Sequence, residues 1–145
     1  MSYQDAIEGL KERIETVDGA AQVLDYEPAS LALLPTIYLM LEGYKRTQEG
    51  QVTVMRYSVL CRLLIRYQDN EKAEWELIPF VNSIAAAIDA DPQLGGRIPR
   101  GYARVNPDRD ARAWFPRVGG TNPITYRGLD VYVDIVDKGA YQSGI

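Results

Sequence analysis

The sequence predicts an α+β domain in which a mostly antiparallel sheet carries two helices on one apolar face. Three observations lead to this fold class. Two segments, residues 2–17 and 70–89, have the period of helices, and strand-like runs lie between and after them. The order along the chain is one helix, two or three strands, a second helix, and two or three strands. The length of 145 residues suits a single domain, 1–145.

Both helices are expected to bury one stripe of side chains. The first carries its apolar residues at spacings of three, four and three, namely Ile7, Leu10, Ile14 and Val17. The second runs to about Asp89, and its expected buried stripe is Trp75, Ile78, Val81, Ala85 and Ile88.

The strand predictions are less regular. Strands are expected at 21–26, 36–42, 52–67 and 129–136. Residues 43–51 have glycine at both ends of a polar stretch and are predicted to form a long hairpin loop. Residues 97–127 contain four prolines and are predicted to be an irregular basic loop region, with short strand-like pieces at 101–105 and 114–118. Residues 138–145 are predicted to be a flexible tail.

The long strand at 52–67 has two different faces, since side chains alternate along a strand. One face is apolar and is expected to lie on the helices: Met55, Tyr57, Val59, Cys61, Leu63 and Ile65. The other face consists of Arg56, Ser58, Leu60, Arg62, Leu64 and Arg66, so half of its residues are arginines. This half-charged face is predicted to be solvated or covered only by a partner.

The composition argues against an enzyme. Without histidine there is no Ser-His-Asp or Cys-His chemistry and no histidine metal ligand. A lone cysteine, Cys61, excludes an intramolecular disulfide and a thiolate zinc site. Asp130 and Asp134 share a strand face but lie about 13 Å apart at ~3.3 Å per residue, too far to act on one bond. We expect no cofactor and no metal. With no apolar run of ~20 residues, we also expect no membrane span and a cytosolic site of synthesis.

Charge is unevenly distributed. Residues 97–127 hold seven arginines against Asp108 and Asp110, whereas the other 114 residues hold 9 basic and 18 acidic side chains. The segment therefore carries a net charge of +5 and the remainder −9. Its arginines are Arg97, Arg100, Arg104, Arg109, Arg112, Arg117 and Arg127. A segregation of this size indicates that the segment meets something negative.

Three interpretations of the basic segment remain open. It folds over the acidic surface of its own chain, or it docks on the acidic body of an identical neighbour, a head-to-tail contact that closes into a ring. In the third it binds nucleic acid, with Tyr102, Trp114, Phe115 and Tyr126 stacking on bases. An overall acidic chain without a known nucleic-acid-binding motif argues against the third. Trp114, flanked by arginines, suits either the core or an interface.

Several stretches in order together resemble the tail terminator, or tail-completion, proteins of long-tailed bacteriophages. These are the acidic N-terminal helix, L-D-Y-E-P, the strand V-T-V-M-R-Y-S-V-L-C-R-L-L-I-R-Y-Q-D-N, the helix E-W-E-L-I-P-F-V-N-S-I-A-A-A-I-D-A-D-P-Q-L-G-G and the closing Y-R-G-L-D-V-Y-V-D-I. The similarity is one of pattern and element order over most of the chain.

The resemblance implies a non-enzymatic virion protein, assembled in the host cytoplasm. Subunits of that family form a hexameric ring on the end of the tail tube, which stops tube polymerisation and offers a surface to the head-side neck or connector protein. DNA passes through the lumen without specific binding. Candidate contacts are Arg56, Arg62, Arg66, the segment 97–127 including Trp114, and Lys45 and Arg46 in a hairpin that projects towards a neighbour. Another phage neck protein, such as a head-closure or connector ring, is the first alternative, and a small nucleic-acid-binding adaptor the second.

Overall fold

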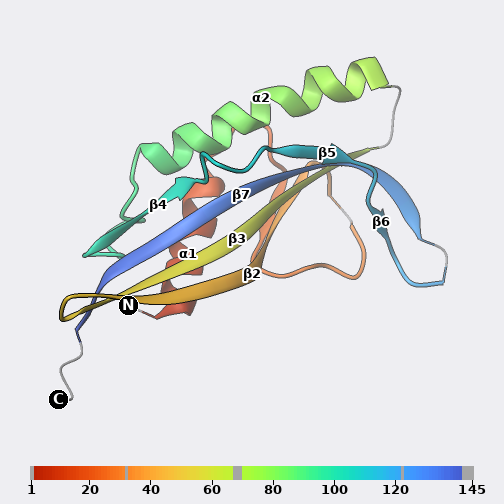
Figure 1. Cartoon of the computed structure of the whole chain (residues 1–145). Coiled ribbons are helices and arrows are strands. Elements are labelled where there is room, and N and C mark those ends of the chain that lie inside the picture. Colours follow the sequence, from red (N-terminus) through yellow and green to blue (C-terminus); the bar gives the residue numbers. More distant parts are fainter. Residues whose placement is uncertain (1, 32, 67–69, 122, 142–145) are drawn as a thin grey trace.

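The computed structural model describes residues 2–31, 33–66, 70–121 and 123–141. Its elements are α1 (Tyr3–Ile14), β1 (Gln22–Leu24), β2 (Thr36–Glu49), β3 (Val52–Arg66), α2 (Asn70–Asp89), β4 (Gly101–Val105), β5 (Arg112–Trp114), β6 (Arg117–Val118) and β7 (Ile124–Tyr141). The sheet is strongly twisted, and three long strands form its middle (Figure 1).

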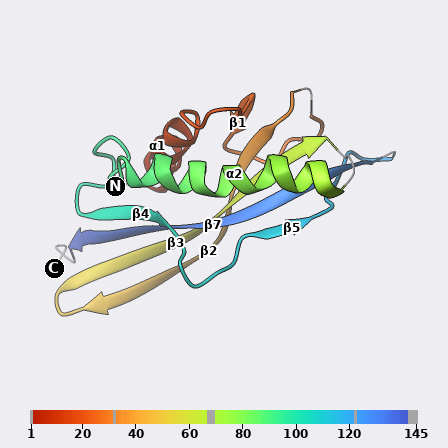
Figure 2. The same ribbon diagram turned by 90° about the horizontal axis from the view of Figure 1, so that it is seen from above.

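The sheet confirms the predicted fold class. Its strand order is β1-β2-β3-β7-β4, and β5 and β6 also pair with β7. Only β1 and β2 are parallel, and every other described pair is antiparallel. Seen from above, α1 and α2 lie on the same side of the sheet (Figure 2). The main core lies between these helices and the apolar faces of β3 and β7.

Helix α1 follows the predicted pattern. Its four predicted stripe residues are all buried, and the Ser2 side chain caps the helix by accepting a hydrogen bond from the Asp5 amide at 3.1 Å. Gly9 is required inside the helix because the segment around Leu94 packs against it and leaves no space for a side chain. A Cβ at Gly9 would lie 2.9 Å from Leu94 Cβ, so the glycine allows the segment around Leu94 to reach α1.

The predicted stripe of α2 is wrong in its first half. Trp75 and Ile78 are 75% and 62% exposed. The helix instead buries a stripe at spacings of three, four and four, namely Leu77, Phe80, Ile84 and Ile88. The sequence places apolar residues around much of this helix, and the sheet covers only one of the two possible stripes.

The predicted loop at 43–51 is also wrong. Strand β2 continues to Glu49, and the turn consists of Gly50 and Gln51, with Gly50 at a φ of +65°. A register shift between Leu41 and Gly43 marks a bulge, so the glycine accommodates an irregularity inside the strand. Residues 43–49 are polar on both sides, so they lack the alternation that would predict a strand.

The basic segment is more ordered than predicted, and the final strand is longer. Within 97–127, β4 has the predicted bounds, and β5 and β6 are separated by Phe115 and Pro116. Strand β7 begins at Ile124 and runs to Tyr141, so residues 138–141 are strand and not a flexible tail. Residues 142–145 lie outside the described residues. Strand β7 pairs with β3 over nearly its whole length, and this pairing stabilises residues 138–141 as strand.

The face of the sheet opposite the helices, here called the open face, is less exposed than predicted. It carries the alternate side chains of β3 from Arg56 to Arg66. Leu64 packs with Tyr38 and Tyr126 in a second, smaller core. Leu60 is 9% exposed, and Arg62 is partly buried. Only the two terminal arginines of β3, Arg56 and Arg66, are exposed as predicted.

Candidate functional site

The centre of the open face holds a row of polar side chains from three neighbouring strands. The register places Tyr38, Arg62 and Asp130 side by side on β2, β3 and β7. Arg62 donates to both Asp130 oxygens, from Nε at 2.8 Å and from Nη2 at 3.1 Å, and from Nη1 to the Tyr38 hydroxyl at 3.1 Å. Its guanidinium lies 4.4 Å from the centroid of the Trp114 ring. This network is a closed, bidentate ion pair under an aromatic ring.

Burial and bonding act on Arg62 in opposite directions. Burial lowers the pKa of Arg62, but the hydrogen bonds that Arg62 donates to Asp130 and Tyr38 outweigh this effect, so the pKa is raised overall. For the Tyr38 hydroxyl, burial has the opposite effect and raises the pKa. Asp130 is only 4% exposed. Arg62 therefore stays charged and paired, and its role is to join three strands.

A second pair of an arginine and an aspartate lies further along β7. Asp134 is 3% exposed and accepts from the Asn106 side chain at 3.4 Å, and Arg104 approaches it at 4.0 Å. Asp130 and Asp134 share a face, as the sequence predicts, but each has its own arginine. Neither carboxylate is presented as a free general base.

The basic segment uses several of its arginines within its own chain. Arg109 donates to Glu42 at 2.8 Å and its guanidinium lies 3.5 Å from the Tyr132 ring centroid, so this side chain bridges β7 and β2 on the open face. Arg97 forms a bidentate pair with Glu12 of α1, at 2.7 and 3.0 Å. These hydrogen bonds raise the pKa values of Arg97 and Arg109. For these arginines the contacts match the first interpretation, a segment folded on its own acidic surface.

The aromatic side chains of the segment are also occupied. Arg127 stacks on Phe115, with its guanidinium 4.3 Å from the ring centroid. Arg62 covers Trp114, which is half-buried, and the Trp114 indole N–H has no acceptor in the described part of the chain. Ring faces already covered by the protein's own guanidinium groups are poorly placed to stack on bases.

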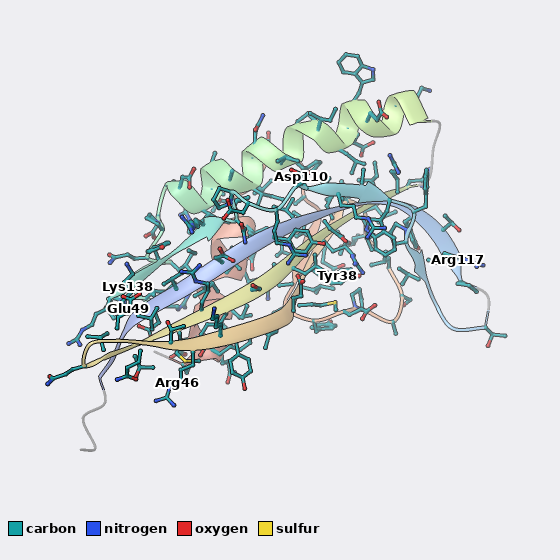
Figure 3. All side chains as sticks on the ribbon, in the orientation of Figure 1. Tyr38, Arg46, Glu49, Asp110, Arg117 and Lys138 are labelled. Atoms are coloured by element: carbon teal, nitrogen blue, oxygen red, sulfur yellow. The ribbon has the colours of Figure 1, made fainter. Side chains whose placement is uncertain are left out.

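Most of the remaining predicted contact residues lie at the two ends of the sheet, whereas Arg112 of β5 lies opposite Asp130, beside the centre. Arg46 lies at the hairpin end, here defined as residues 43–56, and Arg117 lies at the opposite end (Figure 3). Among the described residues these exposed cations form no ion pair: Lys45, Arg46, Arg56, Arg66, Arg100, Arg112 and Arg117. The thirteen predicted contact residues therefore do not form one site. The structure separates them into four arginines paired within the chain, seven exposed cations without an ion pair in the described ranges, the buried Arg127 and the half-buried Trp114.

The hairpin end has an unusual charge arrangement. Lys45 and Arg56 are directly opposite each other across β2 and β3, and both are exposed. They line a polar hollow of about 390 Å³ together with Thr47, Gln48 and Glu49. Like charges directly opposite on a strand pair destabilise it unless an anion lies between them. With two cations against the one carboxylate of Glu49, the hollow keeps a positive charge that suits a further carboxylate.

Sequence reasoning missed the exposed surface of α2. Trp75 and Ile78 were assigned to the core, although Leu77 and Phe80 provide an equally good stripe. The available signal was that an apolar helix with two stripes leaves one of them uncovered when it lies on a single sheet.

Comparisons with family models and with curated proteins find no match. No protein-family model matches the chain, and no curated protein matches it significantly. Neither described helix has both the length and the apolar character needed to cross a membrane. Within the described ranges, no three acidic or cysteine side chains gather as a metal site would require.

Proposed function

We propose that this chain is a non-enzymatic assembly protein that forms a ring, in the manner of a phage tail terminator. The observation that carries the proposal is the hairpin end, where Lys45 and Arg56 oppose each other in an exposed hollow. Glu49 also lines this hollow, but neither cation forms an ion pair within the described residues. Such a pair is stabilised when another molecule supplies an anion.

A second copy of the chain has a suitable anionic surface. Asp5 and Glu8 of α1 are exposed, and so is Glu15 at its C-cap, which lies 3.9 Å from the Lys11 ammonium. The hairpin end and α1 are different patches, so joining them between copies is a head-to-tail contact. A contact of this kind repeats from subunit to subunit and closes when the rotation permits. The resemblance noted above implies six subunits.

A closed ring accounts for the other parts of the proposal. Placed on the end of a tail tube, it covers the surface to which the next tube subunit would add, so growth stops. Its far side is then available to a head-side neck or connector protein. Because the chain has a net charge of −4, DNA passes the lumen without being held. The protein belongs, on this proposal, to the neck of the virion.

The test is to polymerise tail-tube protein of the same virus with and without this chain and to measure tube lengths in electron micrographs. We expect arrested tubes with a density on one end. Tubes of unchanged length, with no density at the ends, would reject the terminator function. Binding to a purified head connector without any effect on tubes would instead indicate the alternative neck ring.

A further inference from the structure

The strongest unassigned feature is a groove between α2 and the sheet. It has a volume of about 300 Å³ and is lined mainly by apolar side chains. Its helix wall consists of Glu74, Leu77, Ile78 and Val81, and its sheet wall of Ala111, Ala113, Arg127 and Leu129. The first half of α2 lies over β5, at the end of the molecule away from the β2–β3 turn (Figure 1). The groove is therefore separate from the hairpin end.

Arg127 gives the groove a specific chemistry. The residue is only 8% exposed, yet its Nε–H is buried without an acceptor in the described part of the chain. Its guanidinium stacks on Phe115 and forms no ion pair within the described residues. A buried guanidinium without a carboxylate carries a desolvation cost that a partner's oxygen atoms would offset. The groove thus combines apolar walls with one unsatisfied cationic donor.

The surface beside the groove indicates a macromolecular ligand. Ile78 lines the groove and is 62% exposed. Trp75, the residue that follows Glu74 on α2, is 75% exposed. The apolar area therefore continues beyond the hollow along α2. Exposed tryptophan beside an apolar groove is typical of the central residues of protein interfaces. A ligand that covers this area is longer than a small metabolite.

We propose that this groove binds a segment of another protein that carries a branched aliphatic side chain next to a carboxylate. The aliphatic group occupies the space between Ile78 and Ala113, and the carboxylate pairs with the Arg127 side chain, which borders the groove. Glu74 lies in the helix wall and opposes any anion there, so the segment's carboxylate is held on the sheet side. This inference does not depend on ring formation.

The experiment uses the full chain, labelled with nitrogen-15, and two peptides. One is acetyl-Gly-Leu-Asp-Leu-Gly-amide, and the matched control has Asn in place of Asp. We expect the Asp peptide to shift the Arg127 Nε–H signal and the amide signals of Ala111 and Ala113. We expect the Asn peptide to bind at least about tenfold more weakly, because a buried charge pair is then lost.

Three variants separate the site from the fold. Ala113→Leu changes an exposed residue and fills the groove, so binding is expected to disappear while the spectrum stays folded. Arg127→Met is expected to remove the preference for Asp over Asn, whereas Glu74→Gln is expected to increase affinity for the Asp peptide. Equal binding of both peptides, or signal changes away from the groove, would overturn the proposal. Concentration-dependent shifts without peptide would also overturn it, since a second copy would then be the occupant.

Discussion

The centre of the open face and the hairpin end both carry cationic side chains, which, in the described part of the chain, are paired with carboxylates at the centre and unpaired at the hairpin end. At the centre, Arg62 and Arg109 each meet a carboxylate of their own chain at 2.8 Å. At the hairpin end, Lys45 faces Arg56 across two strands, and neither is paired within the described residues. The difference shows that the number of basic residues in a segment does not predict a binding surface. What matters is whether the fold has already supplied their anions.

The largest expected effect is at the paired centre. Asp130→Ala leaves Arg62 partly buried without its carboxylate, and we expect a loss of roughly 3 kcal/mol in unfolding free energy, measured by urea denaturation. As a control, Arg62→Met with Asp130→Leu replaces the pair by apolar groups and is expected to recover most of that loss. If Asp130→Ala alone costs no more than an exposed substitution such as Arg66→Gln, the centre is not a stabilising network.

The second effect concerns assembly. Lys45→Gln with Arg56→Gln removes the facing charges, so we expect the isolated subunit to keep or slightly gain stability while tube arrest is lost. Arg109→Gln is the matched control, because its charge is used on Glu42 within the chain, and tube arrest should persist. Raising the ionic strength should weaken assembly of the unmodified protein, since exposed charges are screened. If only Arg109→Gln abolished tube arrest, the paired centre and not the hairpin end would be the assembly contact.

A third prediction concerns the opposite face of β3. Burial raises the pKa of Cys61 from its ordinary value near 9 to about 12. The folded protein should therefore resist Ellman's reagent near pH 8 and react only as it unfolds. Because the folded pKa is the higher one, this contribution to stability is complete below about pH 9 and is lost as the pH rises towards 12. Rapid labelling of the native protein would show that the core is open there.

The smallest expected effect is at the uncovered side of α2. Trp75→Ser changes a residue that is 75% exposed, so we expect the unfolding free energy to change by no more than about 0.5 kcal/mol. Phe80→Ser, on the buried stripe, is the contrasting variant and should be strongly destabilised. Similar losses in both variants would mean that the first half of α2 is covered.

The fold class and the long strand were predictable because their signals are periodic and local. The alternation from Met55 to Ile65 identifies the helix side of β3, and the four apolar residues of α1 mark its buried stripe. The strand at 101–105 was predictable for the same reason. These predictions needed only the spacing of apolar side chains.

The errors have physical causes that the sequence does not display. Residues 43–49 are polar on both sides, so they have no period to detect. Strand β7 extends to Tyr141 because β3 pairs with it over most of its length. The charge of the basic segment was correctly counted, but its partners, Glu12 and Glu42, lie 85 and 67 positions away in sequence from Arg97 and Arg109. Pairing over such distances follows from the tertiary fold alone.

A charge-exchange experiment tests the head-to-tail contact most directly, with tube length in electron micrographs as the measurement. One variant carries Lys45→Glu and Arg56→Glu, and the other carries Glu8→Lys and Glu15→Lys. The account predicts that neither variant alone arrests tubes, whereas an equimolar mixture does, because each then offers the complementary charge to the next subunit. Tubes that stop with the hairpin variant alone, or that fail to stop with the mixture, would contradict it.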